Sequence, residues 1–227
     1  FLSFLYFYFS IFIYIKYLKR NNAVANLLQK ISWNENLYQK PDISGYAIEK
    51  GNDNYISHFG IGHEAWNFNK NELIDGKVYG YLKADVSSLF SEKHNIFFFS
   101  RDSNGDLFFV GYYKDCKYLT EEERIKLKEK MVESGLLDKR INQVYRILKN
   151  EDDFSEWSWD DVESEFGFEV SSFKLEVLPE NITIFENKIP FTEQDCIEVL
   201  EKGWQERYGN YTLITDLDRF LSKFLMK

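Results

Sequence analysis

Residues 57–69, with the sequence SHFGIGHEAWNFN, mix aromatic, glycine and polar side chains without the period of a helix or a strand. This composition is typical of a loop that shapes a pocket. Trp66 is costly as loop filler, because its indole brings a large flat area and one N–H that needs a partner. Trp33 follows the first expected strand, and two such rings can sandwich a flat ligand, with stacking worth about 1–3 kcal/mol per base. We therefore expect an aromatic binding site that contains Trp33, Phe59, Trp66 and Phe68.

Polar side chains accompany these rings and suit the edge of a bound base. An asparagine side chain offers both N–H donors and a carbonyl acceptor, so it can read donor and acceptor positions on a flat ligand. The amides expected to do so are those of Asn34, Asn67 and Asn69.

The same loop suggests a second chemistry, that of a metal-dependent hydrolase or nuclease centred on His58, His63 and Glu64. Their spacing is not that of the zinc-binding HExxH motif, and no third His lies close by in the sequence. The competing interpretation is that these side chains hydrogen-bond the loop into shape.

The elements that must position these residues are mainly strands. Residues 27–33, 77–83, 95–100 and 106–114 are the strand candidates, and the last two are joined by a turn whose Asn-Gly pair favours a hairpin. Residues 96–99 are apolar without alternation, which predicts a strand that is covered on both faces. Such a strand suits the centre of a small barrel.

The hairpin carries a resemblance to a known family. Residues 96–115, IFFFSRDSNGDLFFVGYYKD, combine an apolar strand, a polar turn with Gly and an aromatic strand. Together with a strand that ends in Trp and a glycine-containing loop with a second Trp, this pattern resembles the PUA-like superfamily, in particular its YTH and EVE branches, over residues 27–118. The loop at residues 34–59 is long for that family. The resemblance implies a cage that includes Trp33 and Trp66, and a turn that approaches the sugar–phosphate backbone through Ser100, Arg101 and Asn104.

The resemblance also implies a fold class and a function. The fold is α+β, a small PUA-like mixed β-barrel at residues 24–118 with peripheral helices and a C-terminal extension. The function is a binding module that recognises a modified or flipped-out base in a bacterial restriction or defence system. Its implied partners are modified DNA or RNA, and a nuclease or another protein.

The C-terminal part, residues 119–227, is expected to be mostly helical with one short β-hairpin. Thr120 and Glu123 form a capping-box pattern at the start of a helix, and Gly135 interrupts the helical spacing that follows. Two short strands at residues 173–177 and 182–185 are interpreted as the hairpin. Further helices are expected at residues 194–208 and 215–226.

Composition limits the function. The chain has 227 residues, of which 18% are aromatic and two are Cys. Its net charge of −9 argues against a protein that binds nucleic acid regardless of sequence, because such binding needs many Lys and Arg side chains. Residues 27–118 contain ten basic and twelve acidic residues, a net of −2 that a base-reading pocket tolerates. Two Cys predict a reducing, cytoplasmic setting. No nucleophile-elbow, phosphate-loop or dinucleotide motif is present, so we expect no catalytic activity and no cofactor.

Residues 151–165 support another class of function. Eight acidic residues surround Trp157 and Trp159 there, which is typical of a solvated face or of a segment that docks a basic protein surface. An acidic protein-interaction or inhibitor module is therefore the main alternative to a base reader.

Residues 1–23 begin with an apolar run of fifteen residues, which is followed by Lys16, Lys19 and Arg20. The run is shorter than the roughly 20 residues that a bilayer-spanning helix needs, and no basic region precedes it. We favour translation of AT-rich DNA upstream of a start at Val24 over a genuine short anchor. We therefore expect no stable membrane association and leave the segment out of the fold prediction.

Overall fold

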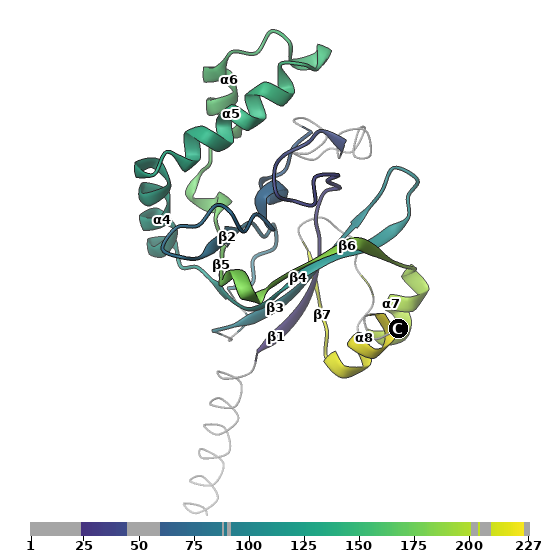
Figure 1. The fold of residues 1–227 in the computed structure, drawn as a ribbon. Helices are drawn as coiled ribbons and strands as arrows, with labels where there is room; N and C mark the ends of the chain where they lie inside the picture. The colour runs from purple at the N-terminus through teal and green to yellow at the C-terminus, as the bar shows by residue number, and fades with distance from the viewer. Residues whose placement is uncertain are drawn as a thin grey trace, which may run out of the picture.

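The computed structural model describes residues 24–44, 60–87, 89, 92–200, 204 and 210–224. The segment 1–23, the predicted site residue Phe59 and His58 of the hydrolase hypothesis lie outside the described residues. Seven strands and five α-helices in the described part confirm the α+β class (Figure 1). The strands are β1 (Ala25–Lys30), β2 (Val78–Gly80), β3 (His94–Arg101), β4 (Leu107–Tyr118), β5 (Leu175–Val177), β6 (Ile182–Phe191) and β7 (Tyr211–Leu213). The helices are α4 (Glu121–Glu133), α5 (Leu136–Leu148), α6 (Trp159–Phe166), α7 (Glu193–Val199) and α8 (Leu217–Phe224).

The strands form one open mixed sheet in the order β2–β5–β4–β3–β1–β7, with β6 also paired to β4. Strand β1 runs parallel to β3, and the other pairs of named strands are antiparallel. Because β3 lies along one edge of β4, strands β5 and β6 share the other edge. No pairing among the described strands closes the sheet into a barrel.

The predicted hairpin of β3 and β4 is confirmed. In its turn, Asp102 Oδ1 accepts the backbone N–H groups of Asn104 and Asp106, both at 2.9 Å, and Gly105 takes a positive φ of 88°. Strand β3 is covered on both faces, as its apolar run predicts: Ile96 and Phe98 belong to one core, while the two phenylalanines that alternate with them belong to another.

Strand β4 is irregular at two places. Val110 is skipped in the pairing of β4 with both β3 and β6, and four residues of β6, 185–188, stand opposite it. Nearer the end of β4, Lys114 and Asp115 stand opposite Asn95 alone, and Asp115 takes a positive φ of 50°. Such bulges bend a strand and redirect its side chains.

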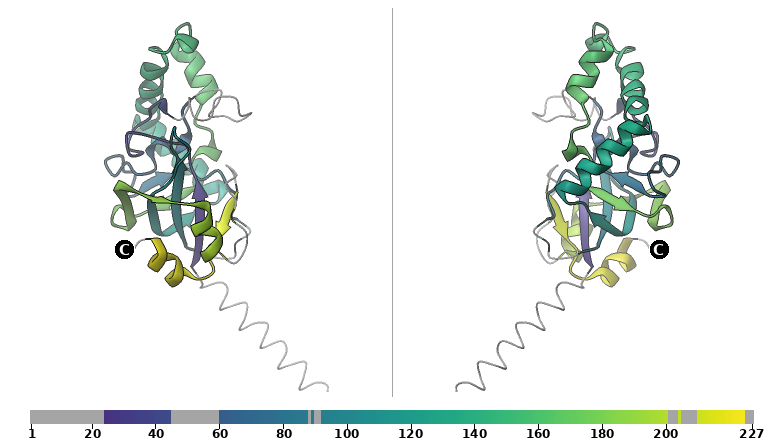
Figure 2. Two further views of the ribbon diagram at one scale, coloured as in Figure 1. Left: turned by 90° about the vertical axis from the view of Figure 1, so that its right-hand side faces the viewer. Right: turned by 90° about the vertical axis from the view of Figure 1, so that its left-hand side faces the viewer.

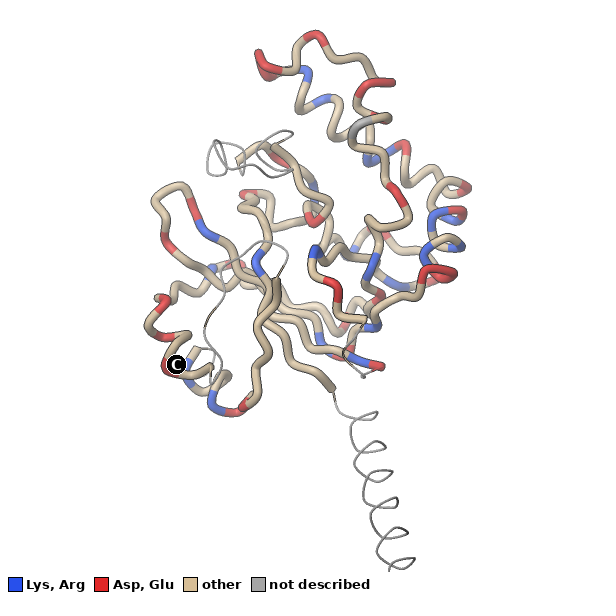
Figure 3. The backbone as a smooth tube through the Cα atoms, turned by 180° about the vertical axis from the view of Figure 1, so that it is seen from behind, with Lys and Arg blue, Asp and Glu red and all other residues tan. Residues whose placement is uncertain are grey.

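The helices pack at two places on the sheet. Helices α7 and α8 cover the face that presents Leu28, Phe97 and Phe109. Helices α4–α6 enclose a separate core with the loop that contains Trp66 and with Tyr79 of β2. Figure 2 shows these two groups at opposite ends of the molecule, and Figure 3 shows acidic residues gathered around the connection from α5 to α6. None of the helices in the described ranges has the length and apolar content needed to cross a membrane.

The helix boundaries follow the predicted caps. The Thr120–Glu123 capping box is formed, and Gly135, with a φ of 69°, separates α4 from α5. The helix predicted at residues 194–208 is formed by α7 as far as Val199, but it ends there, because Leu200 has an extended backbone and Trp204 is not helical. Residues 201–203 and 205–209 lie outside the described part.

The predicted C-terminal β-hairpin is wrong. Strand β5 pairs with β2 and with Lys117–Tyr118 of β4, whereas β6 pairs with residues 107–113 of β4. The turn at Pro179–Asn181 is a short 3₁₀ helix that carries the chain from one part of the β4 edge to another. The expected boundary after residue 118 therefore runs through a single sheet.

Strand β1 ends before Trp33, three residues earlier than predicted. The backbone leaves the sheet because the N–H of Ser32 donates to the buried carboxylate of Glu64 at 2.9 Å instead of to a neighbouring strand. Trp33 consequently stands in a loop.

The bulge at Asp115 leads to a stability prediction. Asp115→Gly should leave the free energy of unfolding unchanged or raise it by up to about 1 kcal/mol, because glycine adopts a positive φ without strain. The matched variant Lys114→Gly should lower it by about 1 kcal/mol, because that residue does not have a positive φ. Urea denaturation measures both, and an equal loss in the two variants would contradict the description of the bulge.

Candidate functional site

Trp33 lies between side chains of β4 and β6. Its ring centroid is 5.7 Å from that of Phe108, in a tilted arrangement, and the ammonium of Lys188 lies 3.5 Å above its ring centroid. The indole N–H donates to the carboxylate of Glu35. Trp33 is half-buried, so the ring is supported by the sheet but remains at the surface.

Lys188 reaches this ring because it belongs to the bulged stretch of β6. Its ammonium donates to the backbone carbonyl of Asn34 at 3.4 Å and lies 3.7 Å from Glu35 Oε2. Its side chain is only 13% exposed, and this burial lowers the pKa of the ammonium, while the carboxylate of Glu35 opposes the shift. An aromatic face, a carboxylate and a carbonyl together hold one cation here.

The loop that carries Trp33 is fixed by polar contacts. Asn34 Oδ1 accepts the N–H of Tyr38 at 2.9 Å, and its amide donates to the carbonyl of Lys40 at 3.0 Å. Asp42 Oδ2 accepts the backbone N–H of Glu35 at 2.6 Å. Leu37 and Tyr38 both have a φ of 54°, a conformation that costs free energy for residues other than glycine and so needs such contacts. Asn34 therefore shapes the loop and has no amide group directed at a ligand.

Trp66 is a core residue. Its side chain is 1% exposed, its indole N–H donates to Gln143 at 2.7 Å, and Phe166 and Phe168 lie edge-on against it. The guanidinium of Arg140 lies 4.9 Å from the ring centroid. A base could reach this ring only if those side chains moved. The structure does not bring Trp66 and Trp33 together, since they share no contact and pack against different elements.

The other predicted site residues serve the fold. The side chain of Asn67 pairs with both backbone groups of Tyr81, and Phe68 is buried against Tyr38, Phe98 and Tyr113. Ser100 is buried and donates to the carbonyl of Ile31 at 2.8 Å. Arg101 donates to the carbonyl of Gly105 and to Glu193, and Asn104 contacts Asp102 within the turn. Asn69, which is also buried, accepts the N–H of Asn71 at 3.0 Å.

Three residues of the Trp33 site were missed by the sequence prediction, namely Glu35, Phe108 and Lys188. Phe108 lies within the strand expected at residues 106–114, but its neighbour Phe109 is indistinguishable from it by residue type. Nothing in the sequence marks Lys188 as a site residue, because it reaches Trp33 only through the bulge in β6 and the pairing of β6 with β4.

Glu64 is buried and His63 is half-buried in the short 3₁₀ helix at His63–Trp66. The His63 ring lies among Tyr81, Phe166 and Phe168, and desolvation lowers its pKa from 6.5 to about 3. A general base that works near neutral pH needs a pKa near that pH, and the pKa of His63 lies well below it. Gly62 permits the close approach of Glu64, because an added Cβ would lie 2.4 Å from Glu64 Oε2. In the part of the chain that is described, no group of three or more His, Cys, Asp or Glu side chains is placed to hold a metal.

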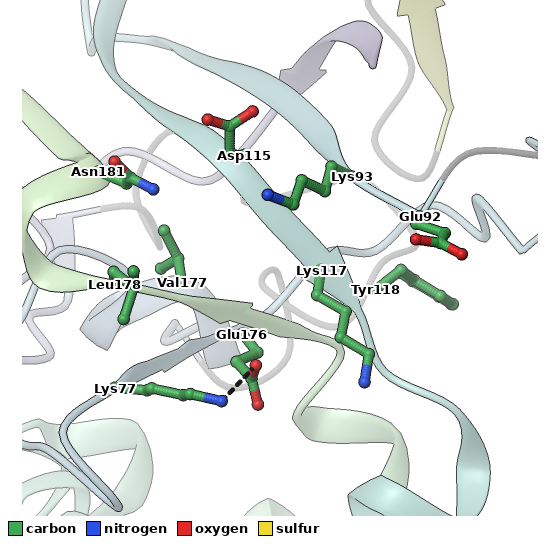
Figure 4. A pocket seen from close by; sticks show the side chains of 10 residues that line it. All are labelled: Lys77, Glu92, Lys93, Asp115, Lys117, Tyr118, Glu176, Val177, Leu178 and Asn181. Atoms are coloured by element: carbon green, nitrogen blue, oxygen red, sulfur yellow. Dashed lines mark hydrogen bonds and ion pairs between the residues drawn. The ribbon is translucent and has the colours of Figure 1, made fainter. Parts of the chain in front are cut away.

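A second concave site lies at the other end of β4. It has a volume of about 710 Å³, and Figure 4 shows the Asp115 carboxylate and the Lys93 side chain on its β4 and β3 side. The ion pair of Lys77 with Glu176, at 2.7 Å, borders it. Its charged lining is balanced between three lysines and three acids, so it offers no net attraction for an anion: Lys77, Lys93, Lys117, Glu92, Asp115 and Glu176.

The comparisons with known proteins assign no family. No protein-family model, curated protein or solved structure matches the chain. The fold and the site define an α+β protein that is built on an open mixed sheet, with the Lys188 ammonium held over an aromatic ring beside it.

The environment of His63 predicts how stability depends on pH. The unfolded chain binds a proton at this ring near the ordinary pKa of 6.5, but the folded protein binds it only near 3. Between these values the unfolded state holds more protons, so the free energy of unfolding should fall as the pH is lowered from 6.5 toward 3. NMR titration of the His63 ring measures the pKa directly.

His63→Phe is the matched variant, because it keeps an aromatic ring in the same cluster and removes the proton linkage. Its stability should depend less on pH across this interval. A His63 ring that titrates near 6.5 in the folded protein would contradict the assignment.

Proposed function

We propose that this chain binds nucleic acid and holds one unpaired base against the ring of Trp33. The observation that carries the proposal is that the face of this ring is covered by the side chain of Lys188, which comes from the bulged stretch of β6. Displacement of that one side chain would open the face, whereas Trp66 is enclosed by core phenylalanines. An exposed base can then stack on the indole, an interaction worth about 1–3 kcal/mol.

Cations beside the Trp33 loop support the same proposal. A concave site of about 400 Å³ is lined by Lys40, Pro41 and Asp42 from the loop and by Gln143 and Arg146 from α5, and Asp42 is its one acidic residue among those described. Lys40 and Arg146 are exposed, and neither side chain has an ion pair with a described residue. They are suited to contact the phosphates next to a bound base, the contacts that position a nucleic acid.

The finer parts of the proposal rest on the sequence resemblance. Under it, the sheet is a PUA-like fold, the base is modified or flipped out, and the reader serves a nuclease or another partner in bacterial restriction or defence. The Trp33 site differs from the expected cage, because a single indole with Lys188 takes the place of two facing tryptophans.

An acidic docking module is the second candidate. Asp152, Asp153, Glu156 and Asp160 are exposed around the connection from α5 to α6 (Figure 3). The tryptophans of this segment are half-buried against the core of helices α4–α6, and the indole N–H of Trp159 donates to Asn142 at 3.1 Å. Trp33 is favoured as the binding ring because the side chain of one lysine lies over its face.

Substitution of Trp33 tests the proposed function. Trp33→Ala should weaken binding of labelled single-stranded DNA or RNA by about 5- to 150-fold, because stacking is lost. Fluorescence anisotropy with plain and methylated oligonucleotides measures the affinities, and urea denaturation shows that the variant remains folded.

Trp159→Ala is the matched control, because Trp159 is also half-buried but lies on α6 away from the proposed site. It should leave the affinity unchanged. Equal affinities for wild type, Trp33→Ala and Trp159→Ala would refute the proposal.

A further inference from the structure

The Trp33 site is built to hold a positive charge. The ammonium of Lys188 lies 3.5 Å from the ring centroid and 3.7 Å from Glu35 Oε2, so a flat aromatic face and a carboxylate act on the same cation. Recognition of cationic ligands by aromatic residues uses this combination. The lysine of the protein itself occupies the position where a ligand would stack.

Further carboxylates act on this position. Asp42 and Asp102 both favour the charged form of Lys188, in addition to Glu35. Asp42 is fixed by backbone N–H groups of the Trp33 loop, and Asp102 by those of the hairpin turn. The negative charge near Lys188 is therefore provided by two segments of the chain, the Trp33 loop with Glu35 and Asp42 and the hairpin turn with Asp102, and it does not leave when Lys188 moves.

A ligand that displaces Lys188 changes the charge of the site. A neutral base leaves the Glu35 carboxylate beside the ring without the cation that now lies 3.7 Å away. A positively charged base restores that pairing and gains a cation–π interaction with the indole. The released Lys188 ammonium becomes available to a phosphate of the same nucleic acid.

We infer that the base held at Trp33 is one made cationic by alkylation of a ring nitrogen. Alkylation at N1 of adenine or at N3 of cytosine gives a base that is positively charged at neutral pH. Methylation at N6 of adenine or at C5 of cytosine gives a neutral one. This inference rests on the proposed function and names the class of base that the site selects.

The experiment compares two bases that carry the same methyl group at different nitrogens and differ in charge at neutral pH. Single-stranded DNA and RNA oligonucleotides carry one N1-methyladenine or one N6-methyladenine at the same central position, and anisotropy measures binding to the full chain. We expect the N1-methyl oligonucleotide to bind roughly 2- to 30-fold more tightly than its N6-methyl isomer. The DNA and RNA arms show which backbone carries the base.

Two variants connect that preference to the site. Glu35→Gln should reduce the ratio of the two affinities toward one, and it should fold normally because the Glu35 side chain is 64% exposed. Lys188→Met should keep or increase the ratio, because it removes the competing ammonium and leaves the carboxylate in place.

The possible results separate the two proposals. Equal affinity for both isomers, lost in Trp33→Ala, would overturn the charge preference and keep the base-binding function. Binding that does not depend on Trp33, or no binding of any oligonucleotide, would overturn both. A trimethyl-lysine peptide that binds more tightly than the oligonucleotides would assign the cation site to a protein ligand and also overturn the inference.

Discussion

Strand β4 is the element on which the rest of the structure depends, because it pairs with three other strands. Strand β3 lies along most of one edge, and β6 and β5 divide the other edge between them. The Trp33 site and the cavity of about 710 Å³ each stand near a place where this pairing is broken. The irregularity at Val110 allows β6 to bulge and brings Lys188 to Trp33. The bulge at Asp115 borders the cavity at the other end of the strand.

The free energy that holds these irregularities comes from the cores around them. Phenylalanines of β3 are buried on both faces of the sheet, and the core of helices α4–α6 adds Trp66. A buried ion pair between Arg140 and Glu72, at 2.9 Å, joins α5 to the loop after Trp66. The free energy of these cores offsets two unfavourable features at the Trp33 site. One is the positive φ of Leu37 and Tyr38 in the Trp33 loop, and the other is the burial of the Lys188 ammonium at the ring. These features distinguish the site from the rest of the surface.

Local signals in the sequence predicted local structure well. The hairpin turn at residues 102–105, the Thr120 capping box and the break at Gly135 depend on short-range hydrogen bonds and backbone angles, and each is formed as expected. Long-range pairing was not predictable in the same way. Strands β5 and β6 were predicted to form a hairpin because they are adjacent in sequence, but each of them pairs with a different part of the long strand β4. Likewise, residue type identified Trp33 and Trp66 as possible members of an aromatic cage. It did not show that Trp66 is buried and Trp33 only half-buried, or that Lys188 lies over Trp33, because both depend on packing between distant segments.

The role of Trp33 can be tested most directly by NMR of the indole N–H groups during titration with an oligonucleotide. The chain has five Trp residues, and each indole gives its own signal. If a base stacks on Trp33 after Lys188 moves aside, the Trp33 signal should shift strongly, because its N–H also contacts Glu35 at the site, while the signal of buried Trp66 should stay in place. A Trp66 signal that shifts while Trp33 does not, or a spectrum in which neither responds to a saturating oligonucleotide, would contradict the assignment of Trp33 as the binding ring.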